Sequence, residues 1–179
     1  MRRRLLILAL AGAALSLGAA AVKVPRSVLA VLEKNFDQRM ERYIVEDPFF
    51  LLGTTRGVYL DGYGAVFTCE VNLITGATIT PFRPRFTKEE IARLRQKKLD
   101  RLPRLRQAMR DMLVSSATAL TTMPEQEQVV VGVSLFYFSW EDASGLPLQI
   151  LMQASRRQLL DFENGRVKNL DEVLRVQEF

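Results

Sequence analysis

An Asp-Gly pair between two stretches of alternating apolar and polar residues constrains the fold more than any other feature of the sequence. The pair is Asp61-Gly62, and the two stretches are residues 56–60 and 63–73. Asp-Gly favours a two-residue β-turn, and alternation with a period of two is typical of a strand with one buried face. The sequence therefore predicts a β-hairpin over these residues.

A two-residue turn also determines the register of this hairpin. It pairs Leu60 with Tyr63 and Val58 with Ala65. The apolar residues of the first strand then share a face with those of the second strand. These second-strand residues are Phe67, Cys69, Val71 and Leu73. We expect that face to pack on the core and Glu70 to lie on the opposite face.

Helical periodicity flanks the hairpin on both sides. Residues 27–44 repeat apolar side chains at three- and four-residue spacing, which predicts a helix. A longer basic helix is predicted over residues 86–121, where Thr87 and Glu90 can form a capping box. Pro103 lies inside this helix and removes one backbone hydrogen bond, so we expect a kink or a division there.

The second half of the chain follows the same plan. Residues 129–138 are apolar on both faces and predict a central strand, and residues 148–155 alternate and predict the strand that returns beside it. Ser155 and Gln158 can form a second capping box at the start of a short helix. The predicted fold class is α+β, in the order α-ββ-α-ββ-α, with an antiparallel sheet of at least four strands in two hairpins and the helices mainly on one face. No string of residues identifies a family.

The N-terminus has the three parts of a secretory signal. Arg2, Arg3 and Arg4 form a basic start, and an apolar run follows them. Ala19 and Ala21 are small residues that suit a signal peptidase. We therefore expect a cleavable signal over residues 1–21 and an exported protein, in the periplasm or outside the cell.

Cleavage would leave residues 22–179 as a single α+β domain. It removes three of the 25 Lys and Arg residues, so that 22 basic residues face 20 acidic ones and the net charge falls from +5 to about +2. A nucleic-acid-binding domain normally has a stronger basic excess, so nucleic acid is not expected as a partner. We expect no stable membrane insertion after cleavage. The alternative is a retained membrane anchor, because residues 5–22 carry no charge and reach the lower length limit of a spanning helix.

The sequence contains no histidine, and Cys69 is its only cysteine. Imidazole catalysis, most zinc, copper and iron sites, and an intrachain disulfide are thereby excluded. No phosphate-binding loop, calcium loop or nucleophile elbow occurs, so we expect neither a metal site nor a cofactor. Cys69 lies on the predicted apolar face, where a buried and unreactive thiol is expected. The alternative is a disulfide between two chains.

Carboxylates are the remaining candidates for acid–base chemistry. Glu70 is predicted on a strand face, and Glu141 and Asp142 are predicted at a turn. Two such groups can hydrolyse a glycoside when they lie about 5–9 Å apart across a cleft. Acidic residues at exposed turns more often only face solvent. A carboxylate-dependent hydrolase of an extracytoplasmic substrate is therefore the alternative to our main hypothesis, a non-catalytic exported module that binds a protein or a component of the cell envelope.

Two further groups of residues are candidates for binding. Tyr59 and Tyr63 flank the predicted turn, where they either form a small recognition surface or pack on the sheet. Arg95 and Lys98 fall within the apolar stripe of the long helix, so they must project beyond the core or meet an acidic surface. The basic segment 88–110 is accordingly a second alternative, a binding surface for anionic lipid, an envelope polymer or an acidic protein.

Overall fold

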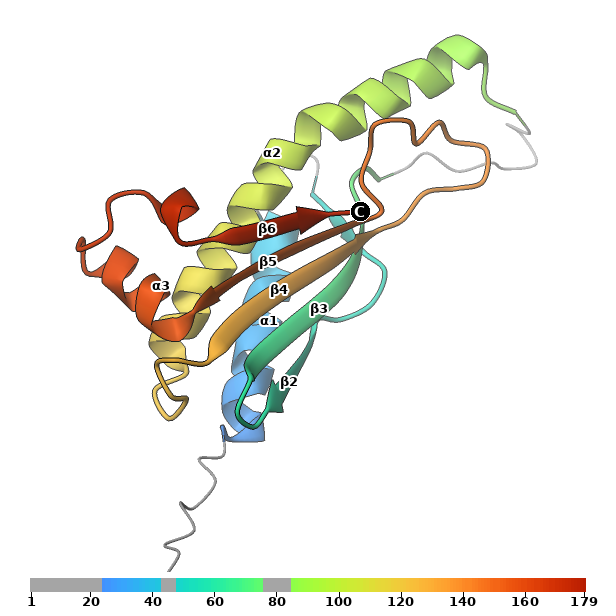
Figure 1. The fold of residues 1–179 in the computed structure, drawn as a ribbon. Coiled ribbons are helices and arrows are strands. Elements are labelled where there is room, and N and C mark those ends of the chain that lie inside the picture. Colours follow the sequence, from blue (N-terminus) through green and yellow to red (C-terminus); the bar gives the residue numbers. More distant parts are fainter. Residues whose placement is uncertain (1–23, 43–47, 76–84) are drawn as a thin grey trace, which may run out of the picture.

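The computed structural model describes residues 24–42, 48–75 and 85–179. The predicted signal, residues 1–21, lies outside these ranges, as do Tyr43 and Ile44 at the end of the first predicted helix. In chain order the elements are α1 (Arg26–Arg42), β1 (Phe50–Leu51), β2 (Arg56–Leu60), β3 (Gly64–Asn72), α2 (Lys88–Ala119), β4 (Gln128–Leu135), β5 (Gln149–Ser155), α3 (Arg156–Glu163), the 3₁₀ turn η1 (Leu170–Glu172) and β6 (Arg175–Glu178) (Figure 1).

The fold is α+β, with three α-helices and one six-stranded mixed sheet in the described part of the chain. The strand order is β1-β3-β4-β5-β6, and β2 also pairs with β3. The prediction of a purely antiparallel sheet is wrong, because β3 and β4 at its centre are parallel. The long helix α2 connects these two strands and returns the chain to the end at which β3 began, as a parallel pair requires. The two predicted antiparallel pairs are present as β2–β3 and β4–β5, but β1 and β6 are additional strands, so the order of elements differs from α-ββ-α-ββ-α.

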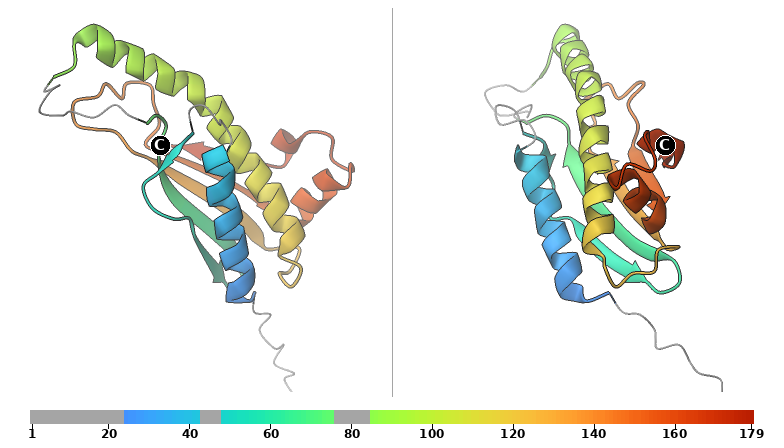
Figure 2. Two further views of the ribbon diagram at one scale, coloured as in Figure 1. Left: turned by 180° about the vertical axis from the view of Figure 1, so that it is seen from behind. Right: turned by 90° about the vertical axis from the view of Figure 1, so that its left-hand side faces the viewer.

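The helices cover one face of the sheet, as predicted. Figure 2 shows α1 and α2 side by side on this face, with α3 next to α2. Between helices and sheet lies the main core, which includes the fully buried side chains of Phe36, Phe67, Met109 and Val131. Cys69 also belongs to this core and is 8% exposed, so its predicted burial is confirmed.

Both capping boxes are confirmed, one at Thr87 and Glu90 and the other at Ser155 and Gln158. Helix α2 is 32 residues long in total and continues through Pro103, so the proline does not divide it. The helix bends along its length, and its first turns extend beyond the sheet (Figure 2). A proline within a helix is a usual cause of such a bend.

The β2–β3 hairpin forms as predicted, but in a different register. Leu60 pairs with Gly64 and Val58 pairs with Val66, so the turn contains a third residue, Tyr63. The Tyr63 backbone nitrogen donates to the Leu60 carbonyl at 3.0 Å. A two-residue turn of the Asp-Gly type needs a positive φ at both positions. Gly62 has a φ of 75°, but Asp61, like every other non-glycine residue in the described chain, does not have a positive φ. The two-residue turn therefore does not form.

This shift by one residue exchanges the two faces of β2. Tyr59 pairs with Ala65 and points toward the core, whereas the predicted register placed Val58 and Leu60 there. Val58 and Leu60 lie instead on the uncovered side of the sheet, where they are 50% and 47% exposed.

Candidate binding surface

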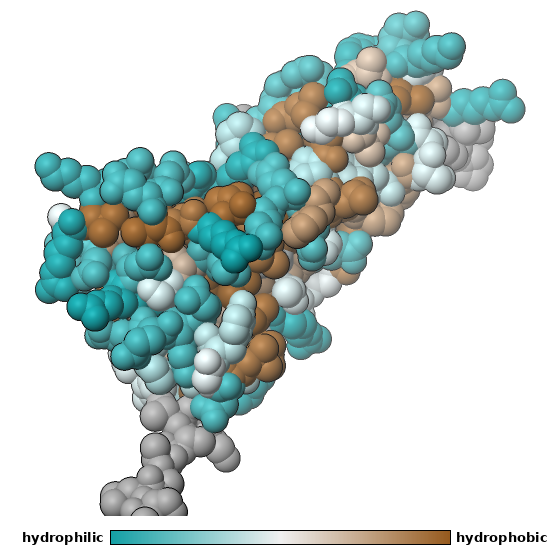
Figure 3. Space-filling view, in the orientation of Figure 1, coloured by the Kyte–Doolittle hydropathy of each residue, from teal (hydrophilic) through white to brown (hydrophobic). Residues whose placement is uncertain are grey.

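Among the described residues, no helix covers the second face of the sheet, which faces the viewer in Figures 1 and 3. We call this surface the open face. Its outward positions are Arg56, Val58 and Leu60 of β2; Gly64, Val66, Thr68, Glu70 and Asn72 of β3; Gln128, Val130, Gly132 and Ser134 of β4; Gln149, Leu151, Gln153 and Ser155 of β5; and Arg175 and Gln177 of β6.

The open face has few charges. Arg56, Glu70 and Arg175 are its charged residues, although 25% of the whole chain is charged. Amides, hydroxyls and aliphatic side chains occupy the other positions that carry a side chain. Space-filling Figure 3 shows apolar patches separated by polar side chains on this side of the molecule. The composition therefore suits a polar but uncharged partner better than a strongly charged one.

Four glutamines of the open face form what we call the amide array: Gln128, Gln149, Gln153 and Gln177. Three of them surround Leu151. Gln149 and Gln153 stand two residues away on either side along β5, about 6–7 Å from Leu151 at the usual strand rise. Gln177 is opposite Leu151 on β6. In the described part of the chain, none of the four side chains has a hydrogen-bond partner, so their amide donors and acceptors are available to a ligand.

A row of valines lies beside the amide array. Val58, Val66 and Val130 occupy neighbouring strands in register, and Gln153 follows Val130 on β5. Val130 is only 3% exposed although it is not part of the main core. Neighbouring side chains of the open face therefore cover it, and this face has a small apolar centre of its own.

Helix α1 closes the edge of the sheet that is formed by β2. The Gly57 backbone nitrogen donates to Glu33 of α1 at 2.6 Å, and the Thr55 nitrogen donates to Asp37 of α1 at 2.9 Å. Arg26 holds the Glu33 carboxylate with two hydrogen bonds of 2.7 and 2.8 Å. Those bonds above all keep the pKa of Glu33 below its usual value. Because α1 occupies the backbone donors of Gly57 in β2 and of Thr55 just before it, this edge is a poorer template for an added strand.

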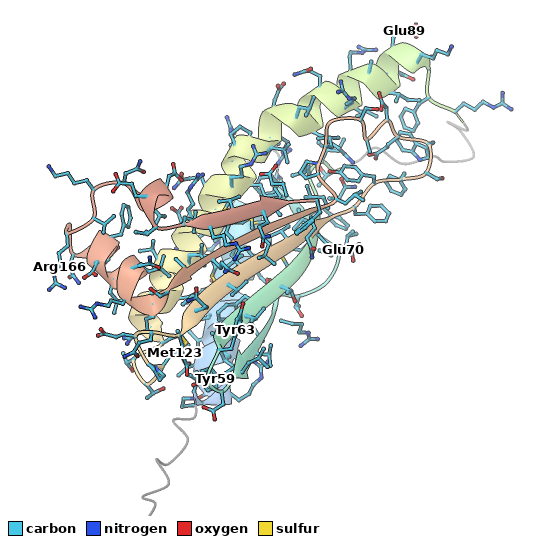
Figure 4. The ribbon with its side chains drawn as sticks, in the orientation of Figure 1. Tyr59, Tyr63, Glu70, Glu89, Met123 and Arg166 are labelled. Atoms are coloured by element: carbon cyan, nitrogen blue, oxygen red, sulfur yellow. The ribbon has the colours of Figure 1, made fainter. Side chains whose placement is uncertain are left out.

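The carboxylates considered for hydrolysis are not on one surface. Glu70 is exposed on the open face, near the end of β3 that is remote from the hairpin turn (Figure 4). Glu141 lies in the loop between β4 and β5, residues 136–148, which we call the arm. Its side chain is 4% exposed and forms an ion pair with Lys98 of α2, so it is buried between the arm and this helix. Asp142 is exposed and lies 3.7 Å from Arg95 Nε.

Arg95 and Lys98 meet an acidic surface, and it belongs to the same chain. The Lys98 ammonium contacts Glu141 and lies 4.7 Å from the centre of the Tyr137 ring. Burial lowers the pKa of Lys98, and the Glu141 carboxylate opposes this shift. Arg95 donates to the Ser144 carbonyl at 2.6 Å. The two cations thus fasten the arm to the projecting half of α2. The complementary charges of the two segments were the only sequence signal for this contact.

Other cations of segment 88–110 also contact acids of the C-terminal region. Arg106 pairs with Glu178 at 2.7 Å, and Arg110 pairs with Asp171 at 2.7 Å. Arg101 is buried with its guanidinium 4.9 Å from the centre of the Phe49 ring. Four of the nine cations of this segment, Arg95, Lys98, Arg106 and Arg110, are therefore paired with acidic side chains of the protein, whereas Lys88, Arg93 and Arg104 are exposed.

The two tyrosines of the hairpin do not share a surface, although both lie near its tip (Figure 4). Tyr59 packs against the core, and burial, followed by the nearby Glu127 carboxylate, raises its pKa to about 12. Tyr63 is 43% exposed. The amide array was not predicted from the sequence, because an alternating polar position does not reveal whether a helix covers it.

Comparisons with known proteins identify no relative: no family model, no curated protein and no solved structure matches this chain. Within the described ranges, no group of three or more Cys, Asp or Glu side chains is arranged to hold a metal ion. The same ranges contain no helix with the length and apolar character needed to span a membrane.

Proposed function

We propose that this protein is an exported, non-catalytic module that binds an uncharged polysaccharide of the cell envelope on its open face. The amide array is the observation that carries this proposal. A side-chain amide both donates and accepts hydrogen bonds, as does a sugar hydroxyl, so an array of unpartnered amides matches a chain of hydroxyl groups. The aliphatic side chains of Leu151 and Val66 supply apolar contact for the C–H faces of the sugar rings.

A polymer suits this surface because the open face extends across β2, β3, β4, β5 and β6. Each amide–hydroxyl hydrogen bond contributes only about 0.5–1.5 kcal/mol. Repeated sugar units allow many such contacts to act together, which raises the overall affinity without any single strong site.

The same observations favour binding over the two alternatives. A hydrolase of this kind needs two carboxylates on one surface. Glu70 is the acidic residue of the open face, whereas Glu141 is buried against Lys98. Binding of an anionic surface through segment 88–110 needs cations that are free to face it. Arg95, Lys98, Arg106 and Arg110 contact acidic side chains of the protein instead. This leaves Lys88, Arg93 and Arg104 as exposed cations without an ion pair in the described part of the chain, and it reduces the charge available for such a surface.

Co-sedimentation of the purified protein with three uncharged or nearly uncharged polysaccharides, cellulose, chitin and an insoluble β-glucan, tests the proposal. We expect binding to at least one of these polymers, with little dependence on salt because the contacts are uncharged. Gln149→Ala with Gln153→Ala should weaken that binding about tenfold, as expected for the loss of two hydrogen bonds. The matched control is Gln126→Ala with Gln38→Ala, two glutamines outside the open face whose side chains likewise have no hydrogen bond within the described residues. Absence of binding to all three polymers, or unchanged binding by the array variant, would overturn the proposal.

A further inference from the structure

A groove of about 430 Å³ lies on the helix side of the molecule, between α2 and the C-terminal segment. It is separate from the open face, so a ligand bound there is independent of the proposed function. One wall is a stripe of α2, and the other wall comes from the end of α3 and the segment around η1. The lining residues are Gln107, Arg110, Asp111, Val114, Phe162, Lys168, Asn169, Leu170 and Asp171.

The floor of the groove is apolar. Val114 and Phe162 are half-buried and pack against the main core, and Leu170 is 7% exposed. These side chains come from α2, α3 and η1, so the floor forms only where these three elements pack together. An apolar floor of this kind accommodates an aliphatic or aromatic group of a ligand.

The walls carry two cations and two acids. Arg110 on α2 and Asp171 on the opposite wall form an ion pair of 2.7 Å across the groove. Asp111 accepts a hydrogen bond of 2.8 Å from Gln107 and lies 3.3 Å from Arg39 of α1. Lys168 has no ion pair within the described part of the chain. The lining is thus neutral overall, yet it offers separate positive and negative groups.

The side-chain carbonyl oxygen of Asn169 is occupied, because it accepts a hydrogen bond of 3.1 Å from the Asp171 backbone. The amide nitrogen of the Asn169 side chain has no partner among the described residues and is a donor beside Lys168. On the acidic side, one oxygen of Asp171 accepts from Arg110 and leaves the other oxygen available. Donors for an anion and an acceptor for a cation therefore lie on neighbouring residues of one wall.

We propose that this groove binds a free α-amino acid with an apolar or aromatic side chain. Lys168 and the Asn169 amide bind its carboxylate, Asp171 accepts from its ammonium group, and its side chain lies on Val114, Phe162 and Leu170. A purely anionic ligand would favour a lining with excess positive charge, and a purely cationic ligand one with excess negative charge. A zwitterion matches the balanced lining, and the groove volume is within the range of small-molecule sites.

Isothermal titration calorimetry with three related probes tests this inference on the intact protein. L-phenylalanine has both charges, 3-phenylpropanoate lacks the ammonium group, and 2-phenylethylamine lacks the carboxylate. We expect L-phenylalanine to bind at millimolar concentration or below, and each analogue to bind about tenfold more weakly, because each loses one charge-assisted interaction.

Variants then assign the contacts. Lys168→Met should weaken L-phenylalanine about tenfold and leave 2-phenylethylamine unchanged, since only the former has a carboxylate. Asp171→Asn should weaken L-phenylalanine but not 3-phenylpropanoate, which has no ammonium group and gains an unpaired Arg110 in the groove. Asp171→Asn also breaks the ion pair between Asp171 and Arg110, and so changes the protein as well as the ligand contact. Lys168 has no ion pair in the described part of the chain, so Lys168→Met tests ligand binding without that second effect. Lys34→Met on the exposed surface of α1 is the matched control and should bind like the original protein.

Three results would overturn the inference: no binding of L-phenylalanine at millimolar concentration, binding of 3-phenylpropanoate as tight as that of L-phenylalanine, or unchanged binding of L-phenylalanine by Lys168→Met. None of these results bears on the open face, whose test uses different residues and different probes.

Discussion

Glu33 on α1 accepts a hydrogen bond of 2.6 Å from the backbone nitrogen of Gly57 on β2. A Cβ at Gly57 would lie only 2.7 Å from Cε1 of Phe67 and 3.4 Å from the Glu33 carboxylate. The glycine therefore allows the ring, the strand and the helix carboxylate to meet in one place. This contact attaches the first helix to an edge of the sheet and closes that edge.

The first prediction concerns Glu33 and pH. Hydrogen bonds from Arg26, chiefly, hold the pKa of Glu33 below its usual value, so ionised Glu33 stabilises the folded state. That contribution is complete above the unfolded pKa, roughly 4.3, and is lost as the pH falls through the lower folded pKa. Glu33→Gln should therefore lower the free energy of unfolding near neutral pH by about 1–3 kcal/mol.

Urea unfolding at a series of pH values measures this difference. The curves of the original protein and of Glu33→Gln should converge in acid, where Glu33 is protonated. Glu41→Gln, an exposed acid on the same helix, is the control and should have little effect. A difference that stays constant down to the most acidic pH would contradict the role of the charge.

The second prediction compares two glycines of the sheet. Gly57→Ala places a methyl group against the Phe67 ring and should destabilise the protein by about 1–3 kcal/mol. A Cβ at Gly132 would meet Thr68 at 3.6 Å and Leu151 at 3.8 Å, which are ordinary contacts. Gly132→Ala should therefore be neutral or stabilise by up to about 1 kcal/mol. Thermal unfolding of both variants measures the contrast, and equal shifts would refute it.

The third prediction concerns the ion pair that fastens the arm. Lys98 and Glu141 are 1% and 4% exposed, so Lys98→Met leaves a buried carboxylate without its cation. This change should cost about 3–5 kcal/mol. Lys98→Met with Glu141→Leu removes both charges and should recover most of the loss, because an apolar pair often replaces a buried ion pair without penalty.

Trp140, the only tryptophan, provides the readout for the arm. Its ring stacks on Phe86 at 4.3 Å and on Phe138 at 5.5 Å, so its fluorescence should change when the arm leaves α2. The single variant should lose this native signal at lower urea concentration than the double variant. The reverse order would show that the ion pair does not hold the arm.

The fourth prediction concerns Cys69. Burial, above all, raises the pKa of its thiol to about 12, so almost no thiolate is present near neutral pH. We expect a thiol reagent to modify Cys69 only as fast as the protein unfolds, and immediately in denaturant. Ser139→Cys, at an exposed position of the arm, is the control and should react at once. Rapid labelling of Cys69 without denaturant would contradict the observed packing of β3.

Local features of the fold were predictable from the sequence, because their causes lie within a few residues. The capping box of Thr87 and Glu90 needs only a hydroxyl and a carboxyl three positions apart. The burial of Cys69 follows from the alternation along its own strand. The hairpin register was not predictable in the same way, since it depends on whether Asp61 adopts a positive φ, and the structure avoids that conformation with an extra turn residue.

Long-range features could not be predicted. The parallel pairing of β3 with β4 depends on the path of α2, and the partner of Lys98 lies in the arm, far along the chain. The glutamines of the amide array are visible in the sequence as alternating polar residues. Only the three-dimensional arrangement shows that Gln149, Gln153 and Gln177 meet around Leu151 on a surface without a covering helix.

The parallel β3–β4 pair also affects how quickly the chain reaches its native state. Gly64 pairs with Gln128, so the whole of α2 must be accommodated before the two central strands can align. Bringing together segments so distant in sequence costs chain entropy before their contacts stabilise the fold, and this cost slows folding. Refolding should therefore take roughly milliseconds to seconds, not microseconds. During that time the apolar face of β3, with Phe67 and Val71, remains available for unwanted association with other unfolded chains.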